Sequence, residues 1–129
     1  MIVLDMHAWV WWLTKPNKLG KKAARSIDKA TRLGVPAICA WEVAMKAEAG
    51  KLKFDRPYDL WIDEALSADS RIELLHLLPR VSIRAAELSW SHADPSDRMI
   101  VATAQLHDAS LVTADERIRD SRLVRCLWE

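Results

Sequence analysis

The hydrophobic positions of this chain form short apolar runs that alternate with longer stretches of helical periodicity. A short, uninterrupted apolar run is typical of a strand that is buried on both faces. Apolar positions that recur once per helical turn are typical of a helix with one buried face. The pattern predicts five strands, at residues 2–4, 35–39, 72–75, 110–113 and 123–127.

The segments between these runs predict helices, and glycine and proline residues mark several of their ends. We expect helices at residues 6–14, 21–33, 41–50, 57–68, 80–90 and 95–108, and a helical turn at 115–119. Gly34 and Gly50 would each end a helix, whereas Asp94 and Pro95 would begin one, as N-cap and first helical residue. Strands that alternate with helices predict an α/β fold, a three-layer sandwich with a parallel sheet of about five strands flanked by helices.

Length and composition limit what such a fold can be. A chain of 129 residues, half of them hydrophobic, is long enough for one core but not for two, so we expect a single domain over residues 1–129. The 19 basic residues nearly balance the 18 acidic ones, which excludes a strongly basic surface over the whole protein. No apolar run could span a bilayer, and Cys39 and Cys126 are too few for a disulfide framework. We therefore expect a soluble, cytoplasmic protein with free thiols and no contact with membranes.

Four acidic residues stand out by their position relative to the predicted strands. Asp5 directly follows the first strand, Glu42 and Asp115 follow the second and fourth, and Asp97 opens the helix before the fourth. Ligands gather beyond the carboxyl ends of parallel strands, so we expect these carboxylates to converge at one edge of the sheet. Such a cluster is self-repelling unless cations occupy it, and oxygen ligands without Cys or His favour Mg²⁺ or Mn²⁺. The chemistry that suits this site is phosphodiester hydrolysis by a metal-activated water.

Each of these acids also has a purely structural explanation. Asp97 would lie in the first turn of the helix that Asp94 caps, where an acid is favourable. Thr113 and Glu116 would form a capping box around Asp115. The metal site therefore depends on all four acids lying together, because no single one of them requires a cation.

Glu42 likewise would lie in the first turn of its helix, where the macrodipole favours an anion and Lys46 is four residues away. Three basic residues lie close to the acids in the sequence: Lys46, Arg98 and Arg117. They either contact phosphates or neutralise the neighbouring carboxylates, and the sequence leaves both possibilities open. His7 and His92 also lie near motif acids, but we assign neither as a metal ligand.

The residues around these acids resemble a known family. The resemblance is carried by residues 3–7, 40–46, 92–104 and 111–115, and the run Asp94-Pro95-Ser96-Asp97-Arg98 is its most specific part. In this order and spacing, the four segments resemble the PIN-domain ribonucleases of the VapC toxin type along nearly the whole chain.

The resemblance implies an Mg²⁺- or Mn²⁺-dependent endoribonuclease built on a sheet of about five parallel strands. It implies that Asp5, Glu42 and Asp97 are the core catalytic and metal-binding acids, that Asp115 is the fourth, and that the Thr113 hydroxyl holds a metal-bound water. It also implies a toxin that cleaves RNA, forms a homodimer and is blocked by a cognate antitoxin protein.

Two positions depart from the family pattern without touching a core acid. Met6 stands where the family often has Thr or Ser, and Ala40 stands where a Ser or Thr often caps the helix that bears Glu42. The tryptophan cluster formed by Trp9, Trp11 and Trp12 is a candidate contact for a second copy or for the antitoxin, although core packing explains most of it equally well.

Other functions share parts of this pattern. A receiver-like signalling module also has a doubly wound sheet, but it needs paired acids after the first strand and a Lys after the last, whereas this chain has Asp5 alone and Arg125. A phosphatase with an Asp nucleophile begins Asp-x-Asp, and here His7 replaces the second acid. A catalytically inactive PIN-like binding module is the remaining alternative, and the presence of all four acids argues against it.

Overall fold

Five short strands form one sheet in the order β3-β2-β1-β4-β5, and every neighbouring pair is parallel. The strands are β1 (Ile2–Leu4), β2 (Leu33–Pro36), β3 (Ile72–Leu75), β4 (Ser110–Val112) and β5 (Cys126–Leu127). The computed structural model describes all 129 residues of the chain. The predicted α/β sandwich with a five-stranded parallel sheet is confirmed.

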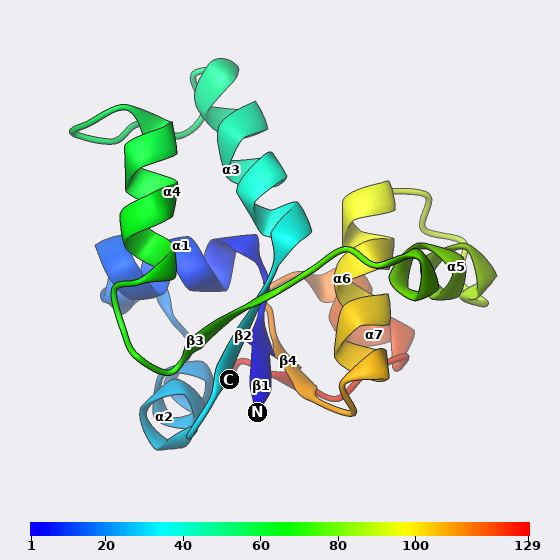
Figure 1. Cartoon of the computed structure of the whole chain (residues 1–129). Helices are drawn as coiled ribbons and strands as arrows, with labels where there is room; N and C mark the ends of the chain where they lie inside the picture. Colours follow the sequence, from blue (N-terminus) through cyan, green and yellow to red (C-terminus); the bar gives the residue numbers. More distant parts are fainter.

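Helices cover both faces of the sheet (Figure 1). They are α1 (Met6–Thr14), the 3₁₀ turn η1 (Pro16–Lys18), α2 (Lys21–Lys29), α3 (Ala37–Glu48), α4 (Tyr58–Leu66), α5 (Pro79–Glu87), α6 (Pro95–Leu106) and α7 (Glu116–Ser121). Figure 1 shows α1, α2 and α4 on one side and α5, α6 and α7 on the other. Right-handed crossovers produce this division, because the chain winds from β1 to β3 in one direction and then returns to β4 and β5 in the other. None of these helices has both the length and the apolar character needed to cross a membrane.

The central strands carry the core of the protein. Val3, Leu4, Leu111 and Val112 are completely buried, as expected for strands with helices on both faces. Trp9 of α1 is also fully buried, with its ring 5.4 Å from that of Trp61 on α4.

The three tryptophans of the predicted cluster, Trp9, Trp11 and Trp12, do not share one environment. Trp9 belongs to the core, so it is not available as an interface residue, while Trp11 and Trp12 are half-buried. The exposed tryptophan of the chain is Trp41 on α3, which the sequence did not single out. The cysteines are both free thiols, as expected.

The second strand begins earlier than its apolar pattern predicts. Helix α2 ends at Lys29 instead of residue 33, and Leu33 and Gly34 instead pair with β1. Gly34 does not end a helix. A Cβ at Gly34 would lie 2.6 Å from Cδ1 of Leu75, so the absence of a side chain lets β3 pack against this strand.

Helix α3 also begins earlier than predicted, at Ala37 rather than residue 41. Pro36 ends the strand and is the N-cap, so Ala40 lies inside the helix and not at its cap. Glu42 is consequently in the second turn of α3 and not in the first. Gly50 follows the end of α3 with a φ of 73°, which agrees with its predicted role as a helix stop.

Candidate active site

The site lies where the winding of the sheet reverses, beyond the carboxyl ends of β1 and β4. These two strands are neighbours in space but not in sequence, which is the arrangement that opens a crevice for ligands in doubly wound sheets. The N–H of Asp5 donates to the carbonyl of Val112 at 3.1 Å and so continues the pairing by one residue. Asp5 and the segment that carries Asp115 therefore leave the sheet side by side.

Asp5 has both a structural and an electrostatic role at this edge. Its Oδ1 accepts the N–H of Ala8 at 2.9 Å and caps α1. The residue is only 7% exposed, and this burial raises the pKa of its carboxyl to about 6, although hydrogen bonds from Thr113 and Ala8 act in the opposite direction. The charges of Asp97 and Asp115 raise it further.

The start of α6 brings two further carboxylates together. Asp94 caps the helix by accepting the N–H groups of Ser96 and Asp97 at 2.9 and 3.1 Å, as its sequence predicts. Burial tends to raise the pKa of Asp94, but these hydrogen bonds outweigh it and hold the pKa below its ordinary value. The Ser96 hydroxyl lies 2.9 Å from Asp94 Oδ1 and 3.0 Å from Glu42 Oε2, so Ser96 joins α6 to α3.

Glu42 is the carboxylate with the least complete set of partners. Its Oε2 accepts from Ser96, but its Oε1 is buried and has no hydrogen-bond partner at all. No ion pair forms with Lys46, contrary to the i,i+4 pairing expected from the sequence. Burial raises the pKa of Glu42 to about 7, and the charges of Asp97 and Asp5 add to this effect.

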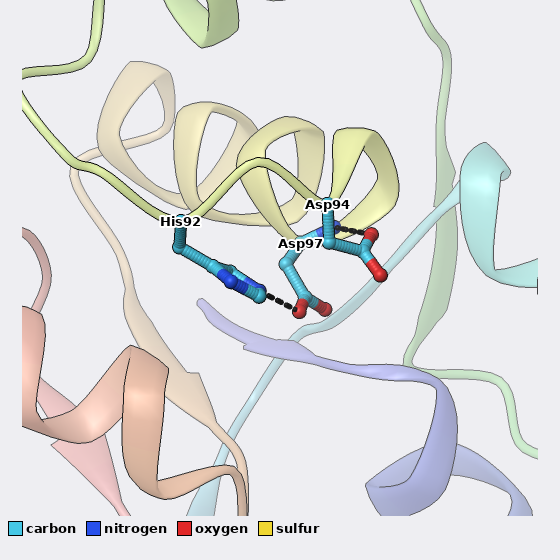
Figure 2. A group of neighbouring side chains, drawn as sticks. All are labelled: His92, Asp94 and Asp97. Atoms are coloured by element: carbon cyan, nitrogen blue, oxygen red, sulfur yellow. Dashed lines mark hydrogen bonds and ion pairs between the residues drawn. The ribbon is translucent and has the colours of Figure 1, made fainter.

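Asp97 is held by His92, to which the sequence gave no role in the site. His92 Nε2 lies 2.7 Å from Asp97 Oδ2, and Figure 2 shows the imidazole and the carboxylate meeting below the start of α6. Burial raises the pKa of Asp97, while the hydrogen bond from His92 lowers it. Ligand atoms of His92, Asp94 and Asp97 all lie within 4.8 Å of one another.

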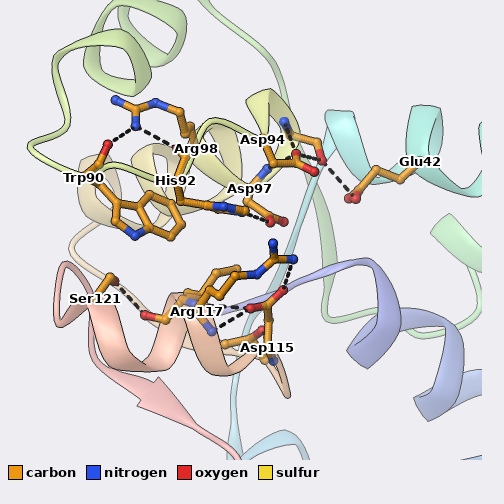
Figure 3. Close-up of polar contacts among 12 residues, drawn as sticks. Glu42, Trp90, His92, Asp94, Asp97, Arg98, Asp115, Arg117 and Ser121 are labelled. Atoms are coloured by element: carbon orange, nitrogen blue, oxygen red, sulfur yellow. Dashed lines mark hydrogen bonds and ion pairs between the residues drawn. The ribbon is translucent and has the colours of Figure 1, made fainter.

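Asp115 approaches from the other side of the crevice (Figure 3). Asp115 itself caps α7, and its Oδ1 accepts the N–H groups of Arg117 and Ile118 at 2.8 and 3.3 Å. The predicted capping box is therefore wrong, because Thr113 precedes the cap and its hydroxyl accepts the N–H of Asp115 at 3.1 Å. Thr113 is completely buried, and the Arg117 guanidinium lies 3.8 Å from Asp115 Oδ2.

Arg98 has a structural role that the sequence did not indicate. Its guanidinium donates to the carbonyl oxygens of Ala85, Leu88, Trp90 and His92 at 2.7–3.0 Å. It contacts no carboxylate, so the neutralising role that the sequence allowed for Arg98 is wrong. Its side chain does not line the cavity around the acids. Its hydrogen bonds instead fix the segment that presents His92 to Asp97 (Figure 3).

One cavity of about 320 Å³ receives all the predicted acids. Its lining is Asp5, Met6, His7, Trp11, Glu42, Lys46, Asp94, Asp97, Ile100, Ala114, Asp115 and Arg117. The structure thus brings together Asp5, Glu42, Asp97 and Asp115, from four separate segments of the chain. Lys46 and Arg117 are the basic side chains that share the cavity with them.

The comparison with known families decides what kind of domain this is. A family model described as "PIN domain" matches residues 2–122. This chain belongs to the PIN-domain family. The PIN domain is 34% identical over 122 residues to Ribonuclease VapC22 of Mycobacterium tuberculosis (strain ATCC 25618 / H37Rv), a match that covers 94% of this chain and 92% of that protein.

Solved structures share the fold of this PIN domain at low sequence identity. The crystal structure of VapBC2 from Rickettsia felis bound to a promoter DNA fragment matches with a TM-score of 0.70 and 18% identity, covering 100% of both chains. FitAcB from Neisseria gonorrhoeae matches with a TM-score of 0.66 and 19% identity, covering 98% of this chain and 96% of that one.

The donor set of this PIN domain fits a divalent cation. The buried and unpartnered Glu42 Oε1 is an oxygen acceptor for which the protein supplies no donor. Burial raises the pKa values of Asp5, Glu42 and Asp97, mutual repulsion raises them further, and a bound cation would stabilise the ionised carboxylates. Hard carboxylate oxygens are the ligands that Mg²⁺ and Mn²⁺ prefer.

Two residues of the site, Ser96 and His92, received no role from the sequence. Ser96 lies between two motif acids, and a serine directly after a capping Asp-Pro could have been recognised as a side-chain donor. His92 precedes the cap by two residues, and only the path fixed by Arg98 shows that its ring turns toward Asp97.

Proposed function

We propose that this PIN domain is an Mg²⁺- or Mn²⁺-dependent endoribonuclease and the toxin of a toxin–antitoxin pair. The observation that carries the proposal is the shared cavity of Asp5, Glu42, Asp97 and Asp115, in which Glu42 Oε1 is buried without a partner. A metal-dependent nuclease needs such a site, because the cation that it holds compensates the charge that develops at phosphorus.

The four carboxylates would hold the cation, and their neighbours would fix their orientation. When bound, the cation would activate water and neutralise charge that develops on the phosphate. Ser96 orients Glu42 on α3, and His92 orients Asp97 on α6. The carboxylate oxygens of these two acids are therefore held in fixed positions. Lys46 and Arg117 are placed to attract the phosphate, since they are the cations of the cavity.

The proposed partners follow from the relatives. The relative with 34% identity is named as a ribonuclease, and the solved structures include toxin–antitoxin complexes and VapBC assemblies. We therefore assign an RNA substrate and a cognate antitoxin protein to this chain. In this proposal residues 1–129 act as one domain in a cytoplasmic homodimer.

Conservative variants test the nuclease activity without disturbing the fold. Asp5→Asn keeps the oxygen that caps α1 but removes the charge, whereas Asp63→Asn changes an exposed acid of α4 outside the cavity. Expression of the wild type and of Asp63→Asn should arrest growth, and expression of Asp5→Asn should not. Equal growth inhibition by all three proteins would remove the nuclease proposal.

The reaction products provide a second test on purified protein. Cleavage of RNA should require Mg²⁺ or Mn²⁺, should stop on addition of EDTA, and should leave a 5′-phosphate and a 3′-hydroxyl. A 2′,3′-cyclic phosphate would show that the RNA 2′-hydroxyl is the nucleophile and would exclude hydrolysis by water. A protein that binds its antitoxin but cleaves no RNA would instead support the inactive binding module.

A further inference from the structure

A second cavity adjoins the acidic one and carries the opposite charge. Its volume is about 460 Å³, and no Asp or Glu contributes to its lining. Four lysines line it, Lys15, Lys18, Lys51 and Lys53, and none of them forms an ion pair. His7 and Trp11 line both cavities, which therefore share a wall. We call the second cavity the lysine groove.

Two segments that are distant in sequence build the lysine groove. Lys15 and Lys18 come from the end of α1 and from η1, and Lys51 and Lys53 come from the connection between α3 and α4. Trp11 lies between the two cavities, with Lys18 Nζ 5.4 Å from its ring centroid and the His7 ring centroid at 5.1 Å. Positive charge and an aromatic ring are thus combined beside the acids.

His7 marks the boundary between the two charge environments. Burial lowers the pKa of His7, and the charges of Lys46 and Lys18 lower it further, while Asp115 acts in the opposite direction. The chain as a whole has a net charge of only +1, so this basic groove is a local feature and not part of a generally basic surface.

We propose that the lysine groove binds the sugar–phosphate backbone of single-stranded RNA next to the phosphate that is cleaved in the acidic cavity. This inference rests on the proposed nuclease function. Unpaired lysines in a groove beside a catalytic site attract successive phosphates of the strand, and a base can stack on an aromatic ring next to them. A groove of about 460 Å³ has room for part of one extended strand.

A binding experiment with a double variant that removes two positive charges tests this groove. Lys18→Gln/Lys51→Gln removes one exposed charge from each side, and Arg25→Gln/Lys29→Gln removes two exposed charges from α2 as the matched control. Binding of a labelled single-stranded RNA of about 12 nucleotides is followed by fluorescence anisotropy in EDTA, over a series of salt concentrations. EDTA prevents cleavage of the RNA during the measurement.

The lysine variant should bind the RNA about 25-fold more weakly at about 0.1 M salt, because two phosphate contacts with their released counterions are lost. The plot of log K against log salt has a negative slope, and the magnitude of this slope should decrease by about 1.4. The α2 variant should match the wild type in both quantities. With Mn²⁺ present, the lysine variant should raise KM for RNA and leave kcat nearly unchanged, since no lysine of the groove lines the acidic cavity.

Each other outcome has a distinct meaning. Wild-type protein that cleaves RNA, with an unchanged KM and salt slope in the lysine variant, overturns the groove alone. Wild-type protein that neither binds nor cleaves RNA overturns the proposed function and the groove together. A lysine variant that binds RNA normally but loses affinity for an acidic antitoxin segment shows that the groove binds protein, and this too overturns the inference. If the first variant is unstable, Lys15→Gln/Lys53→Gln removes the other two lysines of the groove and provides the same test.

Discussion

Ser96 Oγ lies 3.0 Å from Glu42 Oε2 and joins α6 to α3 across 54 residues of sequence. This hydroxyl is the one hydrogen-bond donor that Glu42 receives, because the other carboxylate oxygen is buried without a partner. The orientation of Glu42 in the acidic cavity therefore depends on a side chain that is not itself one of the proposed ligands.

Ser96→Ala should weaken cation binding without unfolding the protein. Loss of the hydroxyl leaves Glu42 without a donor, and partners of metal ligands typically contribute a factor of about 10–100 in affinity. Titration of Mn²⁺ by calorimetry measures this loss. Ser82→Ala on α5, outside the cavity, serves as the control, and an equal Mn²⁺ affinity in the two variants would contradict the role of Ser96.

His92→Ala should also reduce Mn²⁺ affinity, by about tenfold, because Asp97 loses the hydrogen bond that fixes one of its oxygens. His92→Gln should restore part of this affinity, since an amide N–H can replace the imidazole donor. His107→Ala changes an exposed histidine at the end of α6 and should have no effect. If His92→Gln and His92→Ala were indistinguishable, the hydrogen bond would not be the cause.

The stability of the protein without metal should fall as the pH rises from about 4 to about 7. The pKa of Asp5 is about 6 and that of Glu42 about 7 in the folded state, both above their ordinary values. The unfolded chain therefore releases these protons at lower pH than the folded protein does, and ionisation favours unfolding in this window. For Asp5, the shift from 3.8 to about 6 corresponds to about 3 kcal/mol.

Urea unfolding in EDTA at pH 5 and pH 8 measures this dependence. Asp5→Asn should be more stable than the wild type at pH 8 and should show a smaller difference between the two pH values, because the amide keeps the cap and carries no charge. Addition of Mn²⁺ at pH 8 should stabilise the wild type more than the variant. A wild-type protein that is more stable at pH 8 than at pH 5 in EDTA would contradict the prediction.

Arg98→Lys should destabilise the protein by about 3 kcal/mol in urea unfolding. The guanidinium donates to four backbone carbonyls in different directions, and a lysine ammonium cannot reproduce that fork. Arg80→Lys on the exposed face of α5 should stay within about 0.5 kcal/mol of the wild type. A stable Arg98→Lys variant would show that the segment around His92 is held by other contacts.

The fold was largely predictable because apolar runs and helical periodicity are properties of the chain itself. The first strand, the third strand and the first helix have the bounds that the pattern predicts. The errors concentrate at residues 30–40, where a short apolar run fits a strand or a buried helix equally well. There the pairing of Leu33 and Gly34 with β1 decides the outcome, and this is a tertiary contact that no local pattern contains.

The site was predictable at the level of its acids and not of their partners. The convergence of Asp5, Glu42 and Asp115 was predictable because the carboxyl ends of parallel strands meet at one edge, whereas Asp97 was assigned from its motif. The contact of Ser96 depends on how α6 packs against α3, and the contact of His92 depends on the backbone carbonyl oxygens that accept hydrogen bonds from Arg98. Both are consequences of packing, so they required the structure.

Three acids of the cavity, Asp5, Asp94 and Asp115, are also the N-caps of α1, α6 and α7. Asparagine caps a helix as well as aspartate does. Replacement of Asp5 or Asp115 by asparagine would therefore remove a charge from the site while the helix that follows keeps its first turn. Under the proposed function, one such substitution would remove catalysis and leave the fold intact, so a domain that only binds its partner lies one substitution away from the enzyme.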